Sequence, residues 1–365
     1  MKFRQQFMLK IKERRGAVVI IVALIMVVLL GFAALAVDTG YFFATKNELQ
    51  NIADATALAA AGKLGNQYLH ELPYNENAIK AAAVDIGAKN QAGGTAGIEI
   101  RNNDVEIGRW KDPDLNPNGF APISNGTYLS ETTLMPDAVR VTARRDGLAN
   151  SPVSTFFGGI FGVNAVNVSA DATAALGAPL EMKPGIPVGI SKYWFDESNW
   201  PEGEFCNQDI KFHPTGGLEG CAGWHTYDSS PANASKLRGI LDGLKDGSYE
   251  IPETIAGKTK YAFTGGTVAS AFSNLQELYE SKKGNCEDGD PDKWCVNVVV
   301  YDRDDCSNPN KSITIVGFAP TVVTGILGPP QKTIQARVLC EKAVLSRGGS
   351  GEYYGMRSCI PHLVE

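Results

Sequence analysis

Residues 17–37 read AVVIIVALIMVVLLGFAALAV, an apolar run without a single charged side chain. Fourteen of its residues are Leu, Ile, Val or Phe. As a helix the run would extend over about 31 Å, which matches the hydrocarbon thickness of a bilayer. This length and purity predict one transmembrane helix over 17–37, in preference to the buried core helix of a soluble domain.

The charges on the two sides of this run predict its orientation. Residues 1–16 carry six basic side chains against Glu13 alone, a net charge of +5. The whole chain carries −6, so the remainder carries −11. Short basic flanks stay in the cytoplasm, so 1–16 is expected to be a cytoplasmic tail and the rest to be exported. An acidic chain also argues against nucleic-acid binding, which requires a basic surface.

Two kinds of processing are alternatives to a retained anchor. A signal peptide has a shorter apolar region, of about 7–15 residues, although the small residues at 33–36 leave late cleavage open. A prepilin-type signal would use Gly16 and would need Glu where the chain has Ile21. The retained anchor is therefore the preferred interpretation.

The helical pattern continues beyond the apolar run. Small and apolar side chains recur at three- and four-residue steps: Leu49, Ile52, Ala53, Thr56, Ala57 and Ala60. This periodicity predicts one helix over 17–64, with 38–65 outside the membrane and Gly65 as its stop signal. The small-residue face would allow close packing against a sheet or another helix.

Residues 66–178 are predicted to form a first α+β domain with an antiparallel sheet. Its expected elements are a helix over 74–92 capped by Asn75 or Asn77, a hairpin turning at Asn102-Asn103 between strands 97–101 and 104–110, a loop over 112–136, strands over 138–145 and 166–174, and a short helix over 152–161. The three prolines between 179 and 187 mark its end.

Residues 179–365 are predicted to form a second, mostly antiparallel α+β domain. Strands are expected near 187–191, 210–214, 260–264, 295–302, 312–319, 320–327 and 332–340, and helices over 231–244 and 267–282. The first of these helices would be capped by Ser230 with Pro231 at its first position. The Gly-rich residues 346–358 are expected to be exposed.

All seven cysteines lie in this second domain, which fits disulfides formed in an exported, oxidising compartment. Closure of short loops predicts the pairs Cys206–Cys221 and Cys286–Cys295. A strand-to-strand bridge predicts Cys306–Cys340, which leaves Cys359 unpaired.

Residues 14–61 resemble the N-terminal segment of the TadG-like proteins of the Flp/Tad pilus apparatus. The resemblance includes the basic pair before Gly16, the motif Ala36-Val37-Asp38 after the apolar run, and the sequence LQNIADATALA at 49–59. Residues 137–174 resemble the domain that commonly follows in such proteins. Parts of the C-terminal half, such as 222–241 and 301–310, resemble the tails of some members.

This resemblance implies an envelope protein encoded with the pilus machinery used in tight adherence and biofilm formation. Its implied partners are the lipid bilayer and other Tad/Flp pilus-assembly proteins, and a homo-oligomer stays open. Some relatives carry a von Willebrand A domain with an Asp-x-Ser-x-Ser metal site, but here Trp200 stands where the second Ser would be.

Candidate chemistry is sparse. Asp38-Thr39-Gly40 spells an aspartic-protease triplet without a second copy, so a helix-exit aspartate is the preferred interpretation. Asp288, Asp290 and Asp292 are weak calcium candidates, since an EF-hand would need Gly and Glu where Lys293 and Val299 stand. The set Cys206, His213, Cys221 and His225 could bind zinc by residue type, but its spacing favours disulfides. No catalytic residues and no cofactor are predicted.

Three functions follow from these observations. The preferred one is a membrane-anchored periplasmic structural or interaction protein of the pilus-assembly apparatus. The alternative is a minor pilin-like subunit or a surface-exposed adhesion component. An exported enzyme is the least favoured, because neither H-E-x-x-H nor G-x-S-x-G occurs.

Overall fold

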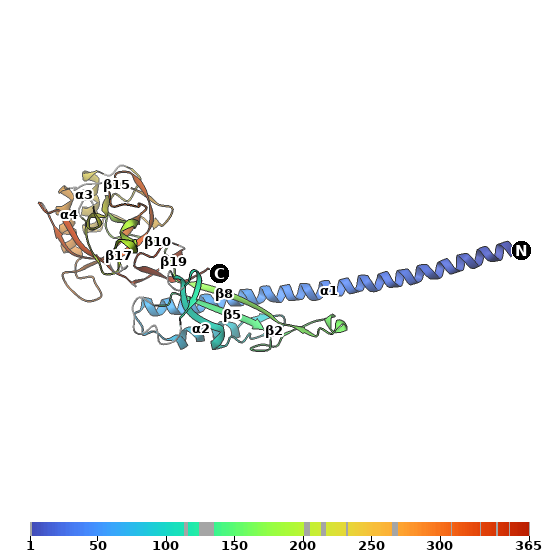
Figure 1. The fold of residues 1–365 in the computed structure, drawn as a ribbon. Coiled ribbons are helices and arrows are strands. Elements are labelled where there is room, and N and C mark those ends of the chain that lie inside the picture. Colours follow the sequence, from blue (N-terminus) through green and yellow to red (C-terminus); the bar gives the residue numbers. More distant parts are fainter. Residues whose placement is uncertain are drawn as a thin grey trace.

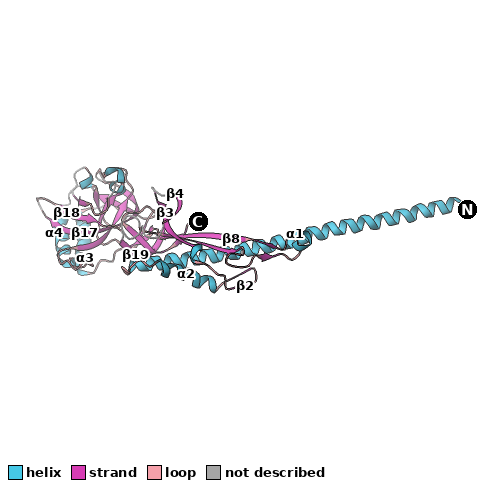
Figure 2. Ribbon diagram, turned by 60° about the horizontal axis from the view of Figure 1, so that its bottom comes forward, coloured by secondary structure: helices cyan, strands magenta, loops and turns pink. Residues whose placement is uncertain are grey.

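A computed structural model of the chain describes residues 2–112, 116–123, 135–200, 205–212, 217–230, 233–264, 269–307, 309–328, 330–340, 342–349 and 351–364. Its fold is α+β, as the sequence predicts. One helix, α1 (Lys2–Leu69), projects far out of the folded part of the chain, and no strand lies beside its N-terminal portion (Figures 1 and 2). The helix is therefore half free and half packed.

The packed half of α1 lies along a five-stranded antiparallel sheet of order β21-β8-β5-β3-β4. Its strands are β3 (Val105–Asp112), β4 (Asn116–Pro122), β5 (Ala138–Arg145), β8 (Val168–Ala175) and β21 (His362–Leu363). All six residues of the predicted helix stripe are buried, from Leu49 to Ala60. The predicted packing of a small-residue face on a sheet is confirmed, because Ala side chains let the helix backbone come close to the strands.

Helix α2 (Glu76–Ala88) packs against α1 and buries Ile79 and Ala83. Asn75 caps it, since its side chain accepts the amide N–H of Ala78 at 3.0 Å. The short strands β1 (Gln91–Ala92) and β2 (Thr95–Ala96) form a hairpin after the helix.

Three local predictions in this half are wrong. Residues 97–101 form no strand; η1 (Asn102–Asp104) is a 3-10 turn, and β3 pairs instead with β4 and β5. The Asp104 side chain accepts the Arg101 amide at 3.1 Å and so closes the turn. The helix expected over 152–161 is a small hairpin of β6 (Val153–Ser154) and β7 (Ala165–Val166) around the 3-10 turn η4 (Gly158–Phe161). The predicted loop over 112–136 contains β4, and its residues 113–115 and 124–134 lie outside the described residues.

The second folded region is built on a seven-stranded sheet of order β12-β18-β17-β15-β13-β11-β16. Because β16 pairs with β17 as well as with β11, five of these strands close into a ring. The strands are β11 (Val188–Ser191), β12 (Asp209–Phe212), β13 (Ala222–His225), β15 (Lys260–Thr264), β16 (Trp294–Tyr301), β17 (Ser312–Leu327) and β18 (Thr333–Val338). Most pairs are antiparallel, but β11 and β16 are parallel.

Helices α3 (Ala234–Asp246) and α4 (Ala269–Lys282) pack on each other, and α4 packs on β17. The cap of α3 is Asn233 and not Ser230, because the Asn233 side chain accepts the Lys236 amide at 2.9 Å. The two strands predicted over 312–327 are one continuous strand, bent at bulges in its pairing with β16 and β18.

The C-terminal end of the chain returns to the first sheet. Strands β9 (Ala178–Pro179), β19 (Lys342–Gly349) and β20 (Met356–Ile360) form a small sheet, β10 (Glu181–Met182) pairs with β14 (Thr254–Ile255), and β21 then pairs with β8. The prediction that 346–358 is an exposed segment is wrong, since Tyr354 and Met356 are buried.

This return also explains why α1 does not stop at Gly65. The helix continues to Leu69, and β20 crosses it at Gly65. A Cβ atom on Gly65 would lie 2.6 Å from the Cys359 carbonyl oxygen. Glycine is needed there for close approach of two backbones and not as a helix stop signal.

Candidate functional site

The free half of α1 has the properties of a membrane span. Every large apolar side chain from Val18 to Val37 is between 50% and 68% exposed. One helix among the described residues, Val18–Leu69, is long and apolar enough to cross a membrane, with a mean hydropathy of 3.3 in its most apolar window, none of which is buried. A soluble protein rarely leaves an apolar surface of this extent uncovered.

Asp38 follows this run directly and is buried. Its carboxylate accepts the Phe156 amide at 2.7 Å, the Phe157 amide at 3.1 Å and the Gly158 amide at 2.7 Å. Three consecutive backbone N–H groups therefore converge on one carboxylate, as in the anion-binding concavities that turns form. The Asp38 side chain therefore holds the turn between β6 and β7 against α1.

A second set of contacts fixes α1 to the rest of the first unit. Tyr41 donates its hydroxyl to the Gly93 carbonyl at 2.7 Å, and the Glu48 carboxylate accepts the Gly93 amide at 2.6 Å. Gly93 has a φ of +53°, and an added Cβ would lie 2.8 Å from the Thr45 hydroxyl. The turn between β1 and β2 is therefore held directly on the first helical turns beyond the apolar run.

The base of the β6–β7 hairpin is held by buried Arg145 at the end of β5. Its guanidinium donates to the carbonyls of Ala92, Gly93, Ser151 and Pro152 at 2.7–3.3 Å. Charged donors to carbonyls are stronger than neutral ones, and a buried guanidinium requires such partners. One side chain thus joins the β1–β2 turn to the segment that leads into the hairpin.

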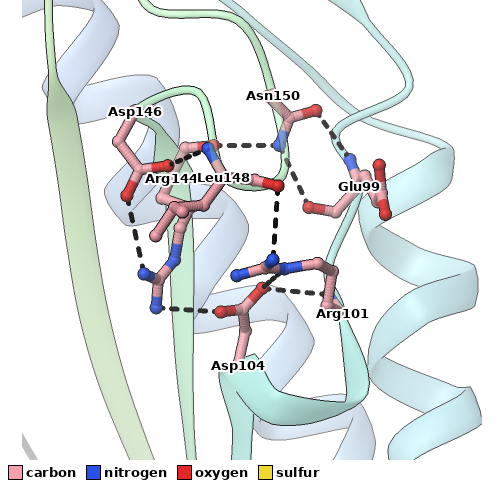
Figure 3. Close-up of polar contacts among 7 residues, drawn as sticks. All are labelled: Glu99, Arg101, Asp104, Arg144, Asp146, Leu148 and Asn150. Carbon is pink, nitrogen blue, oxygen red and sulfur yellow. Dashed lines mark hydrogen bonds and ion pairs between the residues drawn. The ribbon is translucent and has the colours of Figure 1, made fainter.

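A polar network next to Arg145 joins the end of β5 to the turn before β3 (Figure 3). Buried Asp104 pairs with Arg144 at 2.8 Å and with Arg101 at 3.3 Å. Arg101 also donates to the Leu148 carbonyl at 3.2 Å, and Asp146 accepts the Leu148 amide at 3.0 Å.

Asn150 completes this network. It exchanges two hydrogen bonds with the backbone of Glu99, each at 3.0 Å, and donates to the Arg144 carbonyl at 2.9 Å. These hydrogen bonds hold the loop at 146–151, which connects β5 to β6. None of these residues was singled out from the sequence, because their partners are far apart along the chain.

The cysteines of the second region pair differently from the prediction. The bridges are Cys206–Cys340, Cys221–Cys306 and Cys286–Cys295, and Cys359 is free and buried. The predicted pairs Cys206–Cys221 and Cys306–Cys340 are wrong. Strand order decides this outcome: β12, which follows Cys206, pairs with β18, which precedes Cys340.

The candidate metal ligands are occupied by other partners. Cys206 and Cys221 are in disulfides, His225 is buried among aromatic rings, and His213 lies outside the described residues. The calcium candidates face lysines: Lys293 pairs with Asp288 at 2.7 Å and with Asp290 at 3.2 Å, and Lys283 pairs with Asp292 at 3.1 Å. Over the part of the chain that the structure describes, no group of three or more His, Cys, Asp or Glu side chains is placed to hold a metal ion.

A cavity of about 1090 Å³ lies beside the 286–295 disulfide loop. Its polar lining includes Lys183, Lys282, Glu287, Asp288 and Lys293. Asp288 and Lys293 form an ion pair with each other. Glu287 forms an ion pair with Lys342 at 2.8 Å.

The comparisons with known proteins agree with the N-terminal architecture. Residues 16–63 match the model of the Tad family, described as Flp pilus-assembly TadE/G-like. Residues 59–174 match a second model, described as Tad-like Flp pilus-assembly. The two matches meet within the packed half of α1 and end with β8. No curated protein and no solved structure matches the chain.

Proposed function

Because this chain is a TadG-like member of the Tad family of Flp pilus-assembly proteins, we propose that it is an anchor that holds its exported domains at the assembly site in the inner membrane. It has one membrane span, its N-terminus in the cytoplasm and the bulk of the chain in the periplasm. The observation that carries the proposal is the division of α1 into two halves. Its apolar N-terminal half is uncovered, and its C-terminal half packs into the hydrophobic core beside the first sheet.

The charge distribution supports the orientation. The net charge of +5 on residues 1–16 favours retention on the cytoplasmic side, and the rest of the chain carries −11. The three disulfides lie in the C-terminal half and suit an oxidising compartment. Both features support the proposed export of the part of the chain that follows the span.

The mechanism is mechanical coupling. No break in the helix separates the span from the folded body, and Asp38, Tyr41 and Glu48 tie its exit to the surrounding loops. The exported domains are therefore held at a fixed height and orientation above the membrane instead of on a flexible linker. Other pilus-assembly proteins would bind surfaces that this rigid mount presents.

A minor pilin-like subunit is the second candidate. It is favoured by the same continuous helix, because a fibre subunit also has an apolar half that packs with other copies and a half that packs in its own globular domain. The two candidates differ in what becomes of the chain: an anchor stays in the inner membrane at full length, and a fibre subunit leaves it.

Reporter fusions test the anchor. Alkaline phosphatase, active only after export, is fused after Val364, and a cytoplasmic fluorescent protein is fused before Met1. The proposal predicts activity of both reporters and recovery of the full-length chain in inner-membrane fractions. Recovery of a shortened chain in sheared surface fibres would favour the pilin-like function, and an inactive phosphatase fusion would contradict the orientation.

A further inference from the structure

The hairpin that Asp38 holds has an unusual apolar tip. Residues 155–164 read TFFGGIFGVN, and no Asp, Glu, Lys or Arg occurs from Gly147 to Ala170. Five large apolar side chains of the tip are exposed: Phe156 65%, Phe157 41%, Ile160 79%, Phe161 70% and Val163 48%. Water solvates such a cluster poorly, so another apolar phase or surface is expected to cover it.

The position of the tip beside α1 indicates which apolar phase covers it. Asp38 is the first residue after the apolar run, and it binds the backbone of Phe156, Phe157 and Gly158 directly. The Tyr41 ring packs edge-on against Phe156, with 5.1 Å between the ring centroids. In Figure 1 the hairpin extends beside α1 farther toward the N-terminal end of that helix than the rest of the folded body does. The tip therefore lies beside the end of the apolar run of α1.

The backbone of the tip is also prepared for an apolar environment. An unpaired amide is costly in lipid, so a segment that enters it must satisfy its own N–H groups. In the tip, seven of the ten backbone N–H groups of 155–164 have acceptors within the protein. Thr155 donates to Asn164, Ile160 to Phe157, Gly162 to Gly159 and Val163 to Gly158, and Phe156, Phe157 and Gly158 donate to Asp38. The Thr155 hydroxyl donates to the Val163 carbonyl at 2.7 Å.

We propose that the 155–164 tip inserts its Phe and Ile side chains into the outer leaflet of the membrane that α1 spans, as a second contact between the protein and lipid. This proposal rests on the proposed function, since it requires α1 to be in the membrane. The two contacts, one spanning and one interfacial, fix the rotation of the body about the axis of α1, which a single helix leaves free. The occupant is lipid, because Asp38 and Tyr41 hold the cluster beside the end of the uncovered apolar run of α1.

Lipid-quenching of a fluorophore tests the tip. The full chain is purified with Cys359→Ser and carries one added cysteine, from Ile160→Cys, Phe32→Cys or Leu345→Cys, labelled with an environment-sensitive dye. Leu345 is the matched control, because it is 75% exposed, like Ile160, but lies in β19 of the C-terminal region. Phe32 reports on the span. Each labelled protein is reconstituted into vesicles of phosphatidylethanolamine and phosphatidylglycerol that contain lipid with a shallow doxyl quencher.

The expected result is quenching at positions 160 and 32 that is at least threefold stronger than at position 345, with a blue-shifted emission at 160. If position 32 is quenched but position 160 behaves like position 345, the membrane contact of the tip is refuted and the anchor stands. If position 32 is also unquenched, the anchor and the tip proposal both fail. Replacing Phe156 and Phe161 by Ser should reduce quenching at 160 without changing it at 32.

Discussion

Asp38 shows how one residue can have a role that its sequence motif misrepresents. The carboxylate follows a membrane-type helix and is surrounded by three backbone donors of a hairpin about 120 residues later in the chain. Periodicity indicates where α1 runs, but it says nothing of what the residue at its exit touches. The sequence predicts a helix-exit aspartate, and only the fold reveals its partners.

Replacing Asp38 by Ala should loosen the hairpin tip. Three amides would lose their acceptor, and each buried unsatisfied donor costs about 1–3 kcal/mol. Hydrogen exchange at Phe156–Gly158 should accelerate by a factor of about 10–100, while exchange in β5 stays unchanged. Asp85→Ala is the control, because Asp85 is exposed and pairs with Lys89, the residue that follows α2. Unchanged exchange at the tip would show that Asp38 does not hold it.

His225 makes stability depend on pH. Complete burial lowers the pKa of this side chain from 6.5 to about 3, and its ring stacks on Tyr261 with centroids 4.8 Å apart. The unfolded chain takes up the proton below pH 6.5 and the folded chain does not. The contribution of neutral His225 to the free energy of unfolding is therefore complete above pH 6.5. It is lost as the pH falls from 6.5 toward 3, by about 1.4 kcal/mol per pH unit.

His225→Gln should remove this part of the acid sensitivity. Denaturant unfolding between pH 7 and pH 4 should give a shallower loss of stability for the variant than for the native chain. His70→Gln, the same replacement at an exposed position, is the control. Equal slopes for the His225 variant and the native chain would contradict the assignment.

At the scale of elements, the periodic helix α1 and the alternating strands β5 and β8 were predictable from sequence, because each exposes one face and buries the other. The structure of 97–110 was not predictable from sequence. The Asn102-Asn103 pair suggests a hairpin turn, but the Asp104 contacts form a 3-10 turn there and β3 pairs with β5. The disulfide pairs failed for a similar reason: proximity along the chain is a weak guide where strand order brings distant cysteines together.

Gly65 gives the element-scale prediction. A Gly→Ala change inside a helix ordinarily gains up to about 1 kcal/mol. At Gly65 the new methyl group would meet the Cys359 carbonyl of β20, so a net loss of about 1–2 kcal/mol is expected from overpacking. Gly62→Ala, one turn earlier, should be neutral or stabilising, since its nearest neighbour would be Pro361 at 3.9 Å. Thermal unfolding of the two variants measures the difference, and equal behaviour would contradict the close crossing.

At the scale of the whole molecule, the return of the C-terminus was beyond sequence reasoning. Arg357 pairs with Asp137 at 2.6 Å, across 220 residues, and both side chains are buried. Lys342 lies 3.7 Å from Glu71, just beyond the C-terminal end of α1. Composition can divide the chain at the prolines near 179, but it cannot reveal that the last strand completes the first sheet.

Arg357→Met should cost about 3–5 kcal/mol, because it leaves a buried carboxylate unpaired. Burial already raises the pKa of Asp137, against the lowering effect of Arg357. Without Arg357 the pKa should rise further, so the variant loses stability as the pH increases through that value. Adding Asp137→Asn, which keeps an acceptor for the Trp110 amide, should recover part of the loss. A double variant as unstable as the sum of the single variants would exclude the coupling.

The central claim is that α1 spans the membrane and carries the folded body on the exported side. Protease added to intact spheroplasts of cells that make the chain with a tag before Met1 tests it most directly. The prediction is that the body is digested and a tagged fragment of the tail and span survives, with complete digestion only after detergent. A full-length chain that resists protease until detergent is added, or a released body that lacks the tag, would contradict the claim.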